Sequence, residues 1–203
     1  MAKVPILAEH VNVPRVMLNV ESVGLSPEQF FRLCCDNPEL RLELTAQKEL
    51  IVMSPTNPKT GMLNAEITCQ LVNWAKRDGR GVAFDSNAGF TLPNGAKRAP
   101  DGSWMLRTRW EALTPKQTAR FAPVCPDFVL ELWSPSEIFK ELQSKMSEYI
   151  ANGAQLGFLI YPRKQQVYIY RPNQAPQCMD HPVSVSGDPE LPGFTLDLTE
   201  IWK

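Results

Sequence analysis

Histidine is scarce in this sequence, which has only two: His10 near the start and His181 in a polar segment near the end. A zinc site built from imidazoles, or a serine nucleophile activated by a histidine base, would have to use one of these peripheral residues. Histidine-based catalysis is therefore a poor explanation of what this chain does.

Paired cysteines and long apolar runs are also missing. The five cysteines are odd in number, show no C-x-x-C spacing and sit mostly in apolar runs: Cys34, Cys35, Cys69, Cys125 and Cys178. We interpret them as reduced, packed thiols. No run of 18 apolar residues could span a membrane, and the first residues lack the apolar core of a signal peptide. These features predict a soluble protein of the cytoplasm.

The sequence has no excess of charge of one sign. It holds 21 Lys and Arg against 22 Asp and Glu, a net charge of −1, which excludes a highly basic nucleic-acid coat. The distribution is uneven, because residues 76–120 contain nine basic and four acidic side chains while both flanking segments are acidic. This basic middle segment could follow a phosphate backbone, or it is a solvated loop surface.

The apolar patterns predict one α/β domain over residues 1–203, with an extended arm over residues 1–25 and a mixed sheet. We expect a short helix that begins at Pro27, and further helices over residues 60–77, 115–120 and 135–152. We expect strands over residues 41–44, 49–53, 82–84, 89–92, 98–106, 127–133, 156–161, 166–170 and 194–198. The strand at 127–133 is apolar on both alternations, so it should be central and covered on both faces. Directly after it, Ser134-Pro135-Ser136-Glu137 has the pattern of a capping box, which predicts that the next helix begins at Pro135.

Glu131 is the only charged residue between Phe128 and Trp133, in a segment whose pattern demands burial. A buried carboxylate must be neutralised, paired with a cation or bound to a metal. The alternative is that Glu131 faces an opening at the end of its strand. Lys145 lies on the edge of the apolar stripe of the following helix, which packs back across that strand. Lys145 and Glu131 could thus converge, unless the lysine head extends to water.

Two further carboxylates are candidates. Asp101 lies just after a proline inside an expected strand, where aspartate is unfavourable, so it is either a turn residue or a functional one. Glu66 flanks the apolar stripe of the long helix, where an exposed glutamate would be ordinary. Two strand carboxylates, a helical one and a lysine describe a site for Mg²⁺ or Mn²⁺, and phosphodiester hydrolysis is the reaction that fits such a set.

Several segments resemble a known family: residues 49–56 (ELIVMSPT), 64–66 (NAE), 84–90 (FDSNAGF), 92–96 (LPNGA), 99–104 (APDGSW), 125–136 (CPDFVLELWSPS) and 145–154 (KMSEYIANGA). The pattern is similar to that of bacterial proteins described as restriction endonucleases, of the domain-of-unknown-function type, within the PD-(D/E)XK nuclease superfamily. The resemblance covers roughly residues 30–200 in order. It implies a restriction-endonuclease-like fold, a mixed central sheet flanked by helices, often as a homodimer.

The resemblance also implies roles for individual residues. Asp101 matches the first strand carboxylate, Glu131 the second, and Glu66 the helical glutamate that often completes the metal site. The superfamily lysine normally stands two residues after the second carboxylate, where this chain has Trp133; Lys145 matches the family's lysine that has migrated to a helix. Tyr161 stands where relatives often have aspartate, which should alter a turn rather than the metal site.

These observations favour a Mg²⁺-dependent or Mn²⁺-dependent DNA endonuclease. Asp101, Glu131 and Glu66 would bind the metal, Lys145 would position the attacking water, and four basic side chains would contact DNA: Lys97, Arg98, Arg107 and Arg109. A catalytically silent nuclease-fold protein that binds DNA or a protein partner is the second hypothesis. An enzyme acting on a small phosphorylated substrate is a third, and no P-loop or dinucleotide fingerprint supports nucleotide-driven chemistry.

Overall fold

The structure, a computed structural model, describes residues 16–53 and 56–203. Its central feature is a six-stranded sheet with the strand order β11-β10-β9-β8-β7-β4. Neighbouring strands are antiparallel except β8 and β9, which are parallel. The strands are β4 (Gly81–Phe84), β7 (Gly102–Leu106), β8 (Phe128–Leu132), β9 (Leu156–Tyr161), β10 (Gln166–Tyr170) and β11 (Gln177–Asp180).

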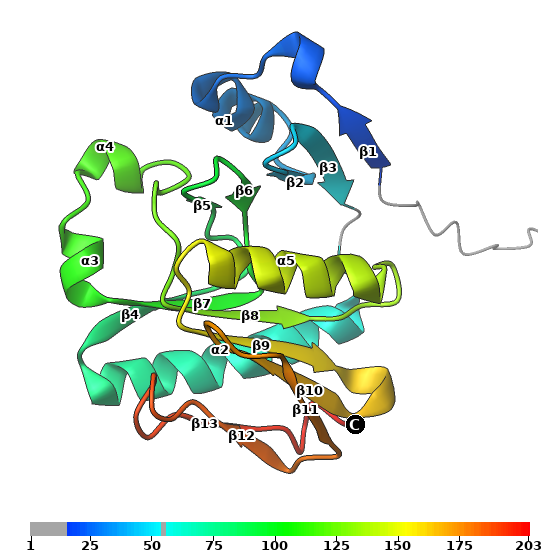
Figure 1. Ribbon diagram of the computed structural model, residues 1–203, viewed down its shortest axis with the longest axis vertical. Helices are drawn as coiled ribbons and strands as arrows, with labels where there is room; N and C mark the ends of the chain where they lie inside the picture. Colours follow the sequence, from blue (N-terminus) through cyan, green and yellow to red (C-terminus); the bar gives the residue numbers. More distant parts are fainter. Residues whose placement is uncertain (1–15, 54–55) are drawn as a thin grey trace, which may run out of the picture.

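A helix covers each face of this sheet (Figure 1). Helix α2 (Pro58–Asp78) lies on one face and α5 (Phe139–Ala151) on the other. All five residues of β8 are buried, as the sequence predicts for a strand covered on both faces. Phe128, Leu130 and Leu132 belong to the core cluster that contains the stripe of α2, whereas Val129 belongs to the cluster that contains Met146 and Tyr149 of α5. Because side chains alternate along a strand, Glu131 faces α5 together with Val129.

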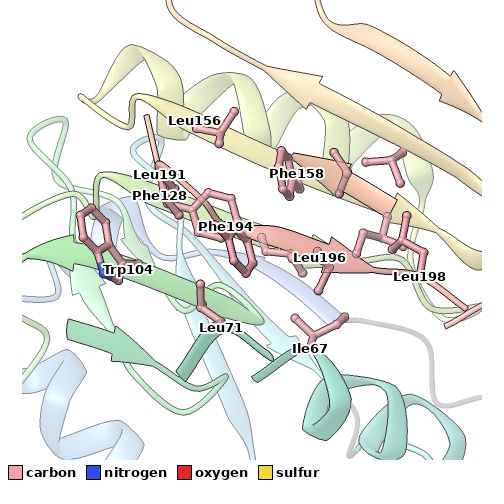
Figure 2. Close-up of a cluster of buried hydrophobic side chains, with 14 of the residues drawn as sticks. Ile67, Leu71, Trp104, Phe128, Leu156, Phe158, Leu191, Phe194, Leu196 and Leu198 are labelled. Atoms are coloured by element: carbon pink, nitrogen blue, oxygen red, sulfur yellow. The ribbon is translucent and has the colours of Figure 1, made fainter. Parts of the chain in front are cut away.

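The C-terminal segment completes the core beneath α2. Strands β12 (Ser184–Ser186) and β13 (Thr195–Asp197) pair with each other. Figure 2 shows Leu191, Phe194 and their neighbours packed against Ile67 and Leu71 of α2 and against the buried face of the large sheet. The C-terminal segment thus fixes α2 against strands β7 and β8.

A second sheet has five strands in the order β1-β3-β2-β6-β5. These are β1 (Val16–Asn19), β3 (Glu49–Met53), β2 (Arg41–Leu44), β6 (Lys97–Arg98) and β5 (Phe90–Thr91), and helix α1 (Pro27–Asp36) packs Phe30 against them. Short helices complete the chain: η1 (Glu21–Val23), α3 (Arg107–Glu111), α4 (Pro115–Thr118) and η2 (Pro162–Lys164).

The mixed sheet flanked by helices agrees with the expected fold class, but several local expectations differ from the structure. The expected strand over 98–106 is divided into β6 and β7 by Pro100 and Asp101. Of the expected arm, residues 16–19 form β1, which pairs with β3, and residues 1–15 lie outside the described residues. The thiols are unpaired as expected, yet they are not all packed: Cys35, Cys69 and Cys178 are exposed.

Helix α5 begins at Phe139 and not at Pro135. The Ser134 backbone N–H donates to the Glu137 carboxylate at 3.1 Å, which is one half of the expected capping box, but the Glu137 N–H donates to the Ser134 carbonyl oxygen and not to its hydroxyl. This local pairing also includes a bond of 2.9 Å from the Ser134 hydroxyl to the Glu137 carboxylate. It closes a turn instead of a helix, because Ile138 then adopts an extended backbone. In the part of the chain that the structure describes, no helix has both the length and the apolar character needed to cross a membrane.

Candidate active site

The register of two antiparallel strands places the main carboxylates beside each other. Gly102 of β7 pairs with Leu130 of β8, so the residue before Gly102 and the residue after Leu130 are neighbours. These residues are Asp101 and Glu131, which are 6% and 2% exposed. The backbone N–H of Leu132 donates to Asp101 Oδ2 at 2.9 Å, which fixes the aspartate against the end of β8.

Lys145 reaches this place from α5. Its Nζ lies 2.7 Å from Glu131 Oε1, and the Tyr149 hydroxyl donates to the same oxygen at 3.1 Å. The lysine therefore meets the glutamate as the helical spacing predicts, and its head does not extend to bulk water. Trp133, at the usual lysine position, instead packs its ring against Tyr161.

Glu43 is a site residue that the sequence did not reveal. It lies in β2, is 2% exposed, and its Oε1 lies 2.8 Å from Lys145 Nζ. Arg98 Nη1 donates to its other oxygen at 3.0 Å, and Arg98 also pairs with Glu148. In a hairpin strand with alternating apolar and polar residues, a glutamate is expected on the face exposed to solvent. Nothing in the sequence near Glu43 indicates that α5 covers this face.

Arg41 was also not identified from the sequence. Its Nη1 lies 3.0 Å from Asp101 Oδ1, and its side chain is 28% exposed. Arg41, Asn64, Asp101, Glu131, Glu137 and Lys145 are among the residues that line a cavity of about 70 Å³. Such a volume is enough for a metal ion with a few water molecules.

Burial and neighbouring charge give the ionisable groups different protonation behaviour. Burial raises the pKa of Glu131 well above its ordinary value, and the nearby Asp101 and Glu43 add to this effect while Lys145 opposes it. Burial would also raise the pKa of Glu43, but Lys145, Arg98 and Arg41 outweigh it and hold that pKa well below the ordinary value. Burial would lower the pKa of Lys145, yet Glu131 and Glu43 raise it, so the ammonium form persists.

Glu66 does not reach the cavity. Its Oε1 accepts from Gln70 Nε2 at 2.9 Å, and Gln70 in turn bonds the backbone of Asp197 in β13. Asn64, two residues earlier on α2, lines the cavity instead, with Nδ2 3.5 Å from Asp101 Oδ1. Two residues correspond to about 200° around a helix, so Asn64 and Glu66 point in nearly opposite directions.

The oxygen atoms that line the cavity are of the kind that bind a hard divalent cation. Carboxylate and amide oxygens are the ligands that Mg²⁺ and Mn²⁺ take in proteins. In the described part of the chain, the buried Asn64 Oδ1 has no hydrogen-bond partner. Within residues 16–53 and 56–203, no group of three His, Cys, Asp or Glu side chains is arranged to hold a metal. A cation here would therefore rely on two carboxylates together with other oxygen atoms.

The four basic residues expected to contact DNA are dispersed. Lys97 and Arg98 are buried, and Arg98 is occupied by two carboxylates, so neither is presented to a phosphate backbone. Arg109 pairs with Asp127. Arg107 is exposed, but it begins α3 at the end of β7 opposite to Asp101 (Figure 1).

Comparison with known proteins agrees with the resemblance seen in the motifs. A crystal structure from Anabaena variabilis, described as "a putative nuclease belonging to DUF820", superposes with a TM-score of 0.70 and 21% sequence identity, covering 88% of this chain and 97% of that one. At this identity the likeness establishes a shared fold. No curated protein matches the chain. The model of the Uma2 family, whose description is "Putative restriction endonuclease", matches residues 27–199. The chain therefore belongs to the Uma2 family of restriction-endonuclease-like proteins.

Proposed function

We propose that this protein is a metal-dependent DNA endonuclease that hydrolyses phosphodiester bonds with Mg²⁺ or Mn²⁺. The observation that carries the proposal is the contact between Lys145 of α5 and Glu131 of β8, in a cavity that also contains Asp101. Membership of a family described as restriction endonucleases supports a nuclease, and a nuclease fold supports the same conclusion. A DNA substrate would place the enzyme in the cytoplasm.

Asp101 and Glu131 would hold the metal. A bound divalent ion polarises the phosphoryl oxygen and lowers the pKa of a water molecule. Lys145 lines the cavity, where its ammonium would orient the attacking water and stabilise developing negative charge. Arg41, which is partly exposed beside Asp101, is the cation on the cavity wall best placed to contact a phosphate of the substrate. Glu66, the third carboxylate implied by the resemblance, has no part in this assignment because it bonds Gln70.

Plasmid cleavage with Mg²⁺ or Mn²⁺ tests the function. We expect nicking by the wild type that requires metal, and a loss of at least about 100-fold in Glu131→Ala and in Lys145→Ala. Lys140→Ala, on an exposed position of the same helix, should cleave like the wild type. Metal-dependent cleavage that survives both site substitutions would reject this assignment.

A second function is favoured by a different observation. Lys145 pairs with Glu131 and Arg41 pairs with Asp101, so both carboxylates are neutralised without a metal. This pairing suits a catalytically silent protein that binds DNA or a protein partner. Binding of DNA without cleavage across several metals and substrates would support it.

We further propose that the chain acts as a single-domain homodimer, as the resemblance implies. Sedimentation at micromolar protein concentration tests this, since a monomeric mass with and without DNA would contradict it.

A further inference from the structure

Asn64 is a buried polar residue whose carbonyl oxygen has no hydrogen-bond partner among the residues that the structure describes. It lies in α2, is 9% exposed, and lines the same cavity as Asp101, Glu131 and Lys145. Its Oδ1 is buried without a hydrogen bond, while Nδ2 lies 3.5 Å from Asp101 Oδ1, at the limit of a hydrogen bond. A buried amide oxygen without a partner is unfavourable, so its retention in the cavity wall points to a ligand that satisfies it.

The two orientations of this amide lead to the same conclusion. With Nδ2 toward Asp101, as in the structure, the oxygen is left without a partner. With the amide turned over, its oxygen would face a carboxylate oxygen across 3.5 Å, which is repulsive unless a cation lies between them. Two oxygens bound side by side to one Mg²⁺ are about 3 Å apart, so the spacing needs only a small adjustment.

Glu66 offers no comparable contact. Its carboxylate is engaged with Gln70, which also bonds both the N–H and the carbonyl of Asp197. This arrangement ties Glu66 to the C-terminal strand and away from Asp101. The helix that should supply a third ligand thus presents an amide, not a carboxylate, to the cavity.

We propose that Asn64 Oδ1 is the ligand that α2 supplies to the metal, in place of Glu66. This inference rests on the proposed metal-dependent function and names a residue of that site. It also fits the described residues, because Glu137, the third carboxylate that lines the cavity, is bonded to the N–H and hydroxyl of Ser134.

Binding of Mn²⁺ alone, measured by titration calorimetry and by the metal-induced shift in melting temperature, tests the proposal without relying on cleavage. We expect Asn64→Leu to bind Mn²⁺ at least about tenfold more weakly than the wild type, as loss of a metal-site contact does. Glu66→Gln, changed on the opposite side of the same helix, should bind within about twofold of the wild type. Asp101→Asn should lose binding and serves as the positive control.

The outcomes separate this inference from the function on which it rests. A wild-type protein that takes up no Mn²⁺ overturns both. A wild-type protein that binds Mn²⁺ while Asn64→Leu binds it equally well, or while Glu66→Gln weakens it more, overturns the role of Asn64 alone. Circular dichroism checks the fold of each variant. If Asn64→Leu does not fold, Asn64→Ala, which removes the amide without adding apolar bulk, makes the same comparison.

Discussion

Lys145 balances two buried carboxylates. Its ammonium lies 2.7 Å from Glu131 and 2.8 Å from Glu43, and its side chain is only 11% exposed. Charges removed from water in this way are tolerated only because each is paired and hydrogen-bonded. The lysine is therefore expected to stabilise the folded protein in addition to its proposed role in catalysis.

Replacing Lys145 by methionine should leave Glu131 and Glu43 buried with less compensation. We expect the free energy of unfolding to fall by about 3–5 kcal/mol, the range for breaking a buried ion pair. Urea denaturation at neutral pH measures this loss. Lys140→Met, at an exposed site on the same helix, should change stability by less than about 0.5 kcal/mol. Equal stability of the two variants would show that the buried network is not needed for folding.

Glu43 predicts a specific dependence of stability on pH. Its pKa in the folded protein lies below the ordinary value of 4.5, because Lys145 and two arginines outweigh the effect of burial. A carboxyl with a lowered pKa contributes stability that is present above pH 4.5 and is lost as the pH falls through the folded-state pKa.

We therefore expect Glu43→Gln to be less stable than the wild type by about 3 kcal/mol near neutral pH. The difference should shrink as the pH falls below about 4, since the wild type then loses the contribution of the carboxylate. Chemical denaturation over this pH range measures the gap. Glu39→Gln, which alters an exposed carboxylate nearby in the sequence, should show no such convergence. A gap that stays constant with pH would mean that Glu43 stabilises the fold by packing alone.

Among the elements, helix α2 supplies Asn64 to the cavity. Asn57 caps its first turn by accepting the Thr60 N–H at 3.0 Å, and the helix runs on to Asp78. The apolar stripe predicted this helix, whereas its start at Pro58 lay two residues before the expected one. Apolar residues repeated every 3.6 positions predict which face of a helix is buried. They do not predict where the helix starts, because the first turn depends on a polar capping residue.

Two glycines in neighbouring elements provide a matched pair of substitutions. Gly61 is an exposed residue of α2 with open space where a Cβ would stand, so Gly61→Ala should stabilise the protein by about 0.5–1 kcal/mol. Gly81 begins β4, where a Cβ would overlap the Trp104 ring and the Met105 backbone oxygen. Gly81→Ala should therefore destabilise by about 1–3 kcal/mol. Thermal denaturation measures both, and shifts of the same sign would contradict this packing.

At the scale of the whole molecule, the sequence predicted the strand that carries Glu131 and the helix that carries Lys145. It placed Asp101 inside a strand, whereas the structure places this residue between β6 and β7. An unbroken apolar run identifies a strand covered on both faces, and the one charge inside it must find a partner. Glu43 and Arg41 could not be predicted in the same way, because α5 and the second sheet meet only through contacts between distant parts of the chain. The sequence around Lys97 and Arg98 likewise did not predict that both side chains are buried.

The distribution of basic residues in space changes the expected path of DNA. Arg107 follows β7 at the end opposite to Asp101, and the six residue steps from Asp101 to Arg107 span about 20 Å of extended chain. This distance is close to the width of a DNA duplex. DNA bound over the cavity therefore does not need a contact with Arg107. Arg41, with its guanidinium beside Asp101, lies on the cavity wall.

We therefore expect DNA affinity to depend on Arg41 and not on Arg107. Arg41→Gln should weaken binding at least about fivefold and reduce the dependence of log affinity on log salt by about one, as the loss of one phosphate contact does. Arg107→Gln should stay within about twofold of the wild type, as should Arg32→Gln, an exposed control on α1. Fluorescence anisotropy with a labelled duplex in Ca²⁺, over a series of salt concentrations, measures both quantities. If Arg107→Gln lost as much DNA affinity as Arg41→Gln, or more, the basic segment of residues 76–120 would lie along the DNA. Only a long contact surface would include both the cavity and the end of β7 that precedes Arg107.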